Sequence, residues 1–297
     1  MAGEEPRGYS IFKETIADLT WPEVEAAVRK GAAMLVPVAV IEQHGPHLPL
    51  GTDTYAAYLL GVLIKKDLES QGFPAVMAPP YYFGLNETTW MFPGSLNVKR
   101  ASLVALLTDL LLNYQQAGFS QQFILNHHGD PQHNDAVMEA IRNARDQGVE
   151  AVYIMGGFVQ HFITEAYQMA FKKPLPLPPE ALIMAGESAK TRKARLRLTR
   201  SQLHVHAEER ETSLMMRYYP ELIKDKEAIK GLRPVLPTPE EFGSAALAGR
   251  WRELSPMGYI GDPSVARQEV GELYALEAKE IAAAVAKYLE QKRQKWI

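Results

Sequence analysis

The sequence predicts an α/β fold in which helices cover a mainly parallel sheet. Nearly continuous apolar runs of strand length occur at 32–42, 73–84, 119–130 and 149–156, and longer segments of helical spacing lie between them. The connections are short, and several helical segments close at a glycine. Strands and helices that alternate in this way form parallel sheets with helices packed on them.

The first half of the pattern begins with a short helix at WPEVEAAVRK (21–30), for which Thr20 is a candidate N-cap. AAMLVPVAVIE (32–42) is typical of a strand that is buried on both faces. DTYAAYLLGVLIKKDLESQG (53–72) has helical spacing. FPAVMAPPYYFG (73–84) predicts a second strand followed by a proline-rich loop.

The second half repeats the alternation. SLVALLTDLLLNYQQAG (102–118) predicts a strongly apolar helix, and FSQQFILNHHGD (119–130) a third strand with a polar end. PQHNDAVMEAIRNARDQG (131–148) predicts a helix and VEAVYIMG (149–156) a fourth strand. A final amphipathic helix is expected at 271–291.

Residues 157–205 do not fit the alternation. They contain the proline-rich KKPLPLPPEAL (172–182) and the basic KTRKARLRLTR (190–200). We interpret the segment as an irregular excursion that serves as a lid or a subunit contact, with the basic run as a solvated helix face. No linker interrupts the chain, so residues 1–297 are expected to form a single domain.

Composition narrows the function. The 32 basic and 35 acidic residues give no electrostatic case for nucleic acid or an anionic membrane, and a small-molecule substrate fits better. No apolar run approaches the roughly 18–20 residues that span a bilayer, and the first residues lack a signal peptide pattern, so we expect a cytoplasmic protein. Without cysteine, a metal must bind histidine and carboxylates, which suits Zn²⁺, Mn²⁺ or Fe²⁺.

Such ligands follow two predicted strands. Glu42 and His44 are two residues apart, so they point the same way on an extended backbone, and His128 and Asp130 form a similar pair. Asp53 follows a glycine-containing loop and opens a helix. Because ligands bind at the carboxyl ends of parallel strands, these side chains are expected at one edge of the sheet.

A third cluster, His206 and Glu211, precedes an apolar helix. A carboxylate between two cations can bridge them, and cations roughly 3.5–4 Å apart can share a water and polarise a carbonyl. We interpret the isolated His133 and His161 as ordinary hydrogen-bonded histidines, and His47 as a residue that holds the first loop.

Five segments resemble, in order, the motifs of the creatininase family of metal-dependent creatinine amidohydrolases and their relatives. They are EQHGPHLPLGTD (42–53), PPYYFG with FPGSLNV (79–98), LNHHGD (125–130), HAEERETSLMMRYYPELI (206–223) and MGYIGDPSVARQEVG (257–271).

The resemblance implies a three-layer α/β/α fold, two divalent metal ions per subunit, and a homo-oligomer, often a hexamer. Zn²⁺ is the first expectation for the metal, with Mn²⁺ or Fe²⁺ as alternatives. Carried over by position, Glu42 and His128 would bind one ion, His44 would bind the other, and Asp53 would bridge them.

The remaining positions leave a choice for the second ion. Asp130 stands where creatininases have a metal-binding glutamate, while Glu211 can replace that ligand in some relatives. We expect Asp130 to be the ligand, with Glu211 as a further ligand or a catalytic residue beside it. His206 matches a histidine near the substrate and is the candidate proton donor to the leaving group.

Departures from the family pattern concern the substrate. Asn86 and Thr89 stand where many members have serine and histidine, His127 replaces a glycine, and Glu208 replaces another. These four are the expected substrate-binding residues. Residues 157–205 hold none of the tryptophans that close over creatinine in creatininases proper. The resemblance therefore implies retained hydrolytic chemistry on a substrate other than creatinine.

The function that follows is hydrolysis of a carbonyl C–N bond in a small cyclic substrate, by a hydroxide that bridges two metal ions. An alternative is C–C bond hydrolysis of a cyclic diketone in inositol or sugar catabolism. A third possibility, of another class, is a catalytically silent relative that binds metal and acts as a structural or regulatory subunit. A nucleotide-binding fold is excluded by the absence of its glycine pattern.

Overall fold

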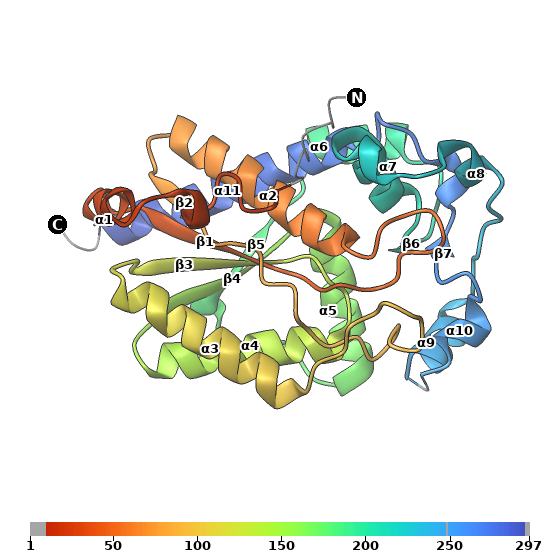
Figure 1. The fold of residues 1–297 in the computed structure, drawn as a ribbon, viewed down its shortest axis with the longest axis horizontal. Coiled ribbons are helices and arrows are strands. Elements are labelled where there is room, and N and C mark those ends of the chain that lie inside the picture. Colours follow the sequence, from red (N-terminus) through yellow and green to blue (C-terminus); the bar gives the residue numbers. More distant parts are fainter. Residues whose placement is uncertain (1–9, 248, 295–297) are drawn as a thin grey trace, which may run out of the picture.

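The computed structural model describes residues 10–247 and 249–294, in which five parallel strands form a central sheet. Helices cover both faces of this sheet, which confirms the three-layer α/β/α sandwich (Figure 1). The spatial order is β2–β1–β3–β4–β5. The strands are β1 (Ala33–Val38), β2 (Ala75–Met77), β3 (Gln121–Asn126), β4 (Glu150–Gly156) and β5 (Leu182–Ala185).

Alternate residues of each strand enter the two halves of the core. In β1, Met34 and Val36 pack in one apolar cluster and Leu35 in the other, as expected of a strand that is buried on both faces. The first cluster involves α1 (Trp21–Arg29), α3 (Arg100–Gln116), α4 (Pro131–Asp146) and α5 (Gly157–Phe171). The second involves α2 (Thr52–Ser70) and α11 (Glu272–Gln294).

The first strand is shorter than expected, since it ends at Val38 and the chain reaches Glu42 as a loop. Pro37 lies inside this strand although proline cannot donate to a ladder. The carbonyl of Pro37 accepts from the N–H of Tyr81, in the loop after β2. The nitrogen of Pro37 faces the same side, where β2 has already ended, so no ladder hydrogen bond is lost. The register Val38 to Asn126 places the ends of β1 and β3 side by side.

The expectation of an irregular excursion at 157–205 is wrong. Most of the segment is regular: α5, the edge strand β5 and α6 (Ala189–Leu198) all lie within it. The prolines of 172–182 lie in the connection between α5 and β5, where they end one element without preventing the next. The basic stretch forms α6, whose side chains are mostly exposed or half-buried.

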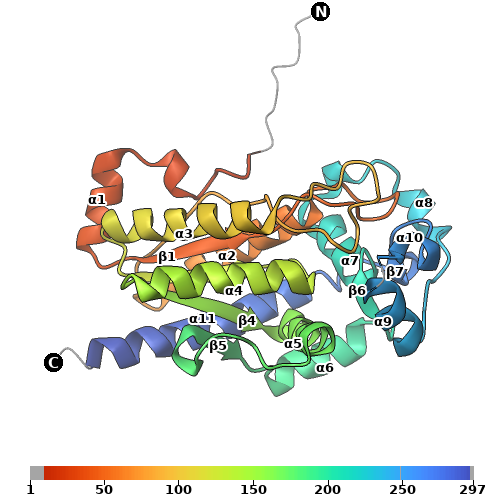
Figure 2. The same cartoon turned by 90° about the horizontal axis from the view of Figure 1, so that it is seen from below.

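A second group of elements lies beyond the carboxyl ends of the central strands (Figures 1 and 2). Its two-stranded antiparallel sheet pairs β6 (His204–His206) with β7 (Ile260–Gly261). Its helices are α7 (Glu209–Tyr218), α8 (Lys226–Lys230), α9 (Pro239–Leu247) and α10 (Trp251–Leu254). Short 3₁₀ helices occur at Ile16–Asp18, Pro179–Ala181, Pro220–Leu222 and Pro263–Val265. Among the described residues, none of the helices combines the length and apolarity needed to cross a bilayer.

Candidate metal centre

One group of possible metal ligands joins the ends of β1 and β3 to the start of α2. The Nδ1 atom of His128 lies 2.8 Å from Oε1 of Glu42 and 3.1 Å from Oδ2 of Asp53. All three side chains are buried, and their ligand atoms lie within 4.8 Å of one another. Two carboxylates and one imidazole at this spacing are a donor set that suits a divalent cation.

A second group shares Asp53 with the first. The other carboxylate oxygen of Asp53, Oδ1, lies 3.3 Å from Nε2 of His44, and that nitrogen lies 3.8 Å from Oε2 of Glu211. His44, Asp53 and Glu211 again place their ligand atoms within 4.8 Å of one another. The two oxygens of Asp53 thus face different groups, which is the geometry of a bridging carboxylate.

Backbone contacts orient these side chains. His128 donates from Nε2 to the carbonyl of Leu85 at 3.0 Å, and His44 donates from Nδ1 to the carbonyl of Glu42 at 3.1 Å. The opposite nitrogen of each ring therefore faces the carboxylates and is the atom that a metal would bind once its proton has left. Glu211 accepts from the N–H of Ala207 at 2.5 Å, which holds its carboxylate in place.

The electrostatics of this cluster demand a positive charge. Burial works against protonation of His44, but Asp53, Glu211 and Glu42 raise its pKa to about 10. Burial likewise opposes protonation of His128, yet Glu42 and Asp53 raise its pKa well above the usual value. In the metal-free protein, protons on the two rings therefore offset part of the negative charge of Glu42, Asp53 and Glu211. A bound cation would fill the same need, so the residues present fit a metal centre.

Asp130 does not join either group. Its Oδ1 accepts from the N–H groups of Gln132 at 2.8 Å and His133 at 3.3 Å, so it caps helix α4. Its Oδ2 accepts from the N–H groups of Glu87 at 2.8 Å and Thr88 at 3.2 Å. Both oxygens are thus engaged by the backbone, and the position expected of Asp130 beside His44 is occupied by Glu211.

The four expected substrate-binding residues lie in different surroundings. Asn86 does not line the cavity that opens over the candidate ligands, because its buried amide donates to the carbonyls of Ile41 and Leu96. Thr89 lines the cavity and donates to Oε2 of Glu42 at 2.5 Å, so it orients a metal-ligand candidate. His127 also lines it, with Nδ1 3.5 Å from Oδ1 of Asp53.

The fourth, Glu208, lines the cavity and caps helix α7. Its Oε2 accepts from the N–H of Arg210 at 3.0 Å and lies 2.5 Å from Nδ1 of His204. These contacts tie the carboxylate to its own helix and to the preceding strand. Its arrangement supports the start of α7, where Glu211 lies.

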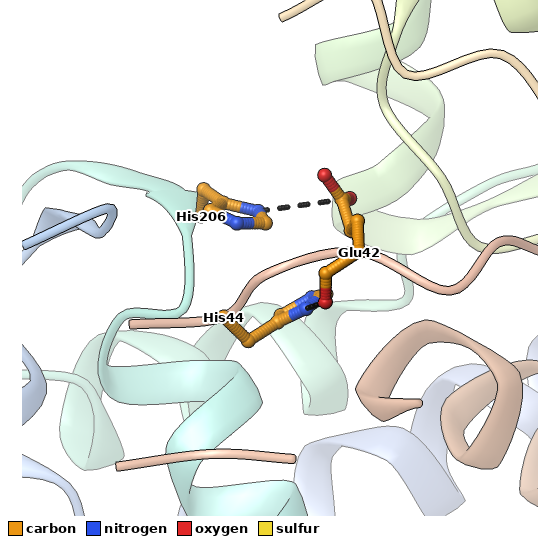
Figure 3. A group of neighbouring side chains, drawn as sticks. All are labelled: Glu42, His44 and His206. Carbon is orange, nitrogen blue, oxygen red and sulfur yellow. Dashed lines mark hydrogen bonds and ion pairs between the residues drawn. The ribbon is translucent and has the colours of Figure 1, made fainter. Parts of the chain in front are cut away.

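His206 lies over the second group, with its ring 4.4 Å from that of His44. Its Nε2 donates to the carbonyl of Gln43 at 2.7 Å, while its Nδ1 lies 4.0 Å from Oε1 of Glu42 (Figure 3). The Nδ1 atom is thus the one directed at the carboxylate cluster. Glu42, His44 and His206 form a third group that meets the same ligand spacing.

Two other histidines have structural contacts, as expected. His47 lies 3.0 Å from Oγ1 of Thr212 and connects the first loop to α7. His133 is buried and contacts Oδ1 of Asn126 at 3.2 Å. The side chain of His161 lies outside the described residues.

A cavity of about 110 Å³ opens over the candidate ligands. One wall is apolar, formed by Met169 and its neighbours in α5, Phe242 of α9 and Trp251 of α10. The edge of Trp251 meets the ring of His206, with centroids 5.7 Å apart. This tryptophan comes after His206 in the sequence, outside the segment 157–205 that holds none. No local motif marks Trp251, or Tyr274 of α11 on another wall.

Comparison with known proteins places these features in a family. The family model described as "Creatininase: Creatinine amidohydrolase" matches residues 17–289. A curated relative, the mycofactocin precursor peptide peptidase of Mycolicibacterium smegmatis, is 26% identical over 244 residues, which cover 80% of this chain and 78% of that protein. The 3-dehydro-scyllo-inosose hydrolase of Thermotoga maritima is 25% identical over 129 residues, 42% of this chain and 38% of that protein.

Solved structures agree on the fold. A crystal structure of creatinine amidohydrolase (creatininase) superposes with a TM-score of 0.64 at 19% identity and covers 94% of this chain and 97% of that one. A structure titled "Creatininase Mn" gives a TM-score of 0.63 at 19% identity, covering 94% and 98%.

Proposed function

The chain belongs to the creatininase family of metal-dependent hydrolases, and from this premise we propose that it binds two divalent metal ions and hydrolyses an amide C–N bond. The observation that carries the proposal is the placement of Asp53, whose two carboxylate oxygens face two separate ligand groups. A single bridging carboxylate between two such groups is the arrangement that two-metal hydrolases need.

The first ion would be held by Glu42, Asp53 and His128, and the second by His44, Asp53 and Glu211. Glu211 replaces Asp130 in this assignment, because both oxygens of Asp130 are engaged by backbone N–H groups. Zn²⁺ and Mn²⁺ both suit histidine and carboxylate ligands.

When bound, the pair of cations supplies an activated water and polarises the substrate carbonyl. The remaining chemistry belongs to the side chains. His206 keeps its Nε2 proton on the carbonyl of Gln43, so its Nδ1 is the atom that would take the proton released by the attacking water and pass it to the departing nitrogen. Thr89 holds Glu42 by its hydroxyl, and Trp251 covers His206 and excludes water from this side of the cavity.

The substrate we propose is an amide other than creatinine. The long matches to peptide peptidases support a C–N bond as the target. The apolar wall of α5, α9 and α10 favours an apolar group next to the scissile bond. A homo-oligomer, with a hexamer as the first expectation, and a cytoplasmic location remain part of this proposal.

The second candidate is C–C bond hydrolysis of a cyclic ketone, favoured by the partial match to the inosose hydrolase. Both reactions use the same attack on a carbonyl and differ in the atom that leaves. Release of an amine therefore separates the two. A silent metal-binding relative would release nothing from either substrate.

The test is metal content per subunit on protein purified without added metal or chelator, repeated on Asp53→Ala. We expect about two equivalents in the parent protein and near none in the variant, since Asp53 belongs to both groups. Circular dichroism confirms that the variant is folded. Hydrolysis of a panel of linear amides, cyclic amides and cyclic ketones follows. Little metal in folded parent protein, or no turnover of any substrate, would contradict the proposal.

A further inference from the structure

A second cavity, here called the outer groove, lies beside the metal-centre cavity and has a volume of about 780 Å³. It runs between the loop at 85–90, the start of α3, the start of α4 and the end of α5. The residues that the argument uses are Glu87, Thr88, Trp90, Lys99 and Gln132. Nothing in the metal-centre chemistry requires this groove.

The outer groove begins where the inner cavity opens. Most residues around the inner cavity are buried, and its mouth is marked by the partly exposed ones, which include Thr88, Pro131, Met169 and Ala170. Three of these, Thr88, Pro131 and Ala170, also line the outer groove. A substrate longer than the inner cavity therefore emerges over this ridge into the groove.

The groove presents mixed polar and aromatic groups. The side chain of Trp90 is 57% exposed. Tryptophan is highly buried on average, so this exposure is unusual. Glu87, Lys99 and Gln132 are exposed as well. The one other cation on its wall, Arg100, is paired with Asp135 and Glu139.

These groups select a class of ligand. The carboxylate of Glu87, which accepts from the side-chain amide of Asn97, and the ammonium of Lys99 together give no net charge, so the groove does not suit a polyanion. An exposed indole with neighbouring amide and charged groups suits a chain of amide units with mixed side chains. A small rigid ring would leave the groove empty.

We propose that the outer groove is a substrate subsite that binds the part of an extended, peptide-like substrate lying away from the scissile amide, with Trp90 as its main contact. This inference rests on the proposed amide hydrolysis and names its substrate class. The inner cavity takes the short end of the chain, and the groove takes the long one.

The experiment compares amides of one scissile bond in three forms: the shortest hydrolysed form, and forms extended by four residues on its amino or its carboxyl side. With metal-loaded enzyme, extension on one side should raise kcat/KM by roughly tenfold or more. In Trp90→Ala this gain should be lost, chiefly through KM, and Trp90→Phe should restore most of it. Trp21→Ala is the matched control, because Trp21 is 77% exposed on α1 and outside both cavities.

A second readout does not depend on turnover. The extended peptide should bind the folded Asp53→Ala variant, and adding Trp90→Ala should weaken that binding by roughly tenfold. Loss of activity on every amide would defeat the proposed function, whereas hydrolysis of short amides with no gain on extension would defeat only the groove. A change in oligomeric state of Trp90→Ala on size-exclusion chromatography would assign the groove to an interface between copies and also overturn the proposal.

Discussion

Glu42 and His128 reach the metal centre from the ends of two adjacent strands, whereas His206 and Glu211 reach it from β6 and α7, outside the central sheet. A ladder whose register joins Val38 to Asn126 fixes the two strands, and Glu42 and His128 follow in the loops just after it. His206 and Glu211, here called the α7 half, are held by the short β6–β7 pair and by single contacts such as the N–H of Ala207 to Glu211.

The exposure of the ligands follows the same division. The side chains of Glu42 and His128 are 2% and 3% exposed, and that of Glu211 is 15% exposed. The more deeply buried side chains are held by their surroundings before any ligand arrives, which lowers the cost of ordering them on binding. We therefore expect the ion at Glu42, Asp53 and His128 to bind more tightly than the ion at His44, Asp53 and Glu211.

The sharpest way to break this comparison is Glu211→Gln, which keeps the shape of the side chain and removes its charge. The variant should retain about one metal equivalent per subunit after dialysis and lose kcat/KM by on the order of a thousandfold, because two-metal chemistry needs both ions. Elemental analysis and initial rates measure the two effects. Retention of both ions would return the second site to Asp130.

His206→Asn tests the other member of the α7 half. The variant should keep both metal ions and lose on the order of a hundredfold or more in kcat, because it removes a proton donor and no expected metal ligand. A substrate with a better leaving group should recover much of the loss. Loss of metal would instead make His206 a ligand, as its spacing to Glu42 and His44 permits.

The pH dependence of metal binding tests the strand-end half as well. His44, with its pKa raised to about 10, and His128, with its pKa also raised, are protonated at pH 7 in the metal-free protein. Metal must displace these protons, so affinity should rise about tenfold per pH unit for each proton released, between roughly pH 7 and 9. Calorimetry in buffers of different ionisation enthalpy counts the protons. Affinity that does not change over this range would contradict the charge balance of the cluster.

The same protonation bears on stability. A histidine whose pKa is raised by folding stabilises the metal-free protein fully below its unfolded value of about 6.5. For His44 that contribution is lost as the pH rises toward about 10. The metal-free protein should therefore unfold at lower denaturant concentration at pH 9 than at pH 6.5, and the metal-loaded protein should not follow this trend.

Asp130→Asn should have the smallest effect and is the matched control for Glu211→Gln. Asparagine can still cap α4, but its amide nitrogen faces the N–H groups of Glu87 and Thr88. The expected cost is about 1–2 kcal/mol in the free energy of unfolding, with both metal ions retained. Denaturant titration and metal analysis check the two statements. A variant that loses one ion at unchanged stability would make Asp130 a ligand.

The difference between the residues that follow β1 and β3 and those on β6 and α7 also explains which parts of the site could be predicted from the sequence. The apolar runs predicted the sheet, and the i, i+2 pair Glu42 and His44 is a local pattern, so both could be recognised. The shared sheet edge followed from the topology of parallel strands. Four of the ligand candidates, Glu42, His44, Asp53 and His128, meet there as expected.

The sequence alone could not decide whether Asp130 or Glu211 lies beside His44. Asp130 is diverted because the loop at 87–88 brings two backbone N–H groups to it, and no pattern in sequence reports that approach. The place of Trp251 could not be predicted for a similar reason, since it reaches His206 across 44 residues of intervening chain. The prolines of 172–182 misled in the opposite direction, because a few breakers in one connection concealed a regular strand at β5.

The pairing of β6 with β7 sets an order of assembly. It joins His204 and His206 to Ile260 and Gly261, so the strand that carries His206 is completed only after residue 261 has folded back. During synthesis β6 is made before its partner β7, and α11, which covers one face of the central sheet, is made last. The strand that carries His206 therefore waits unpaired until Ile260 and Gly261 have been made. A chain that ends before residue 260 should lack both the β6–β7 pair and the cover that α11 gives to the sheet.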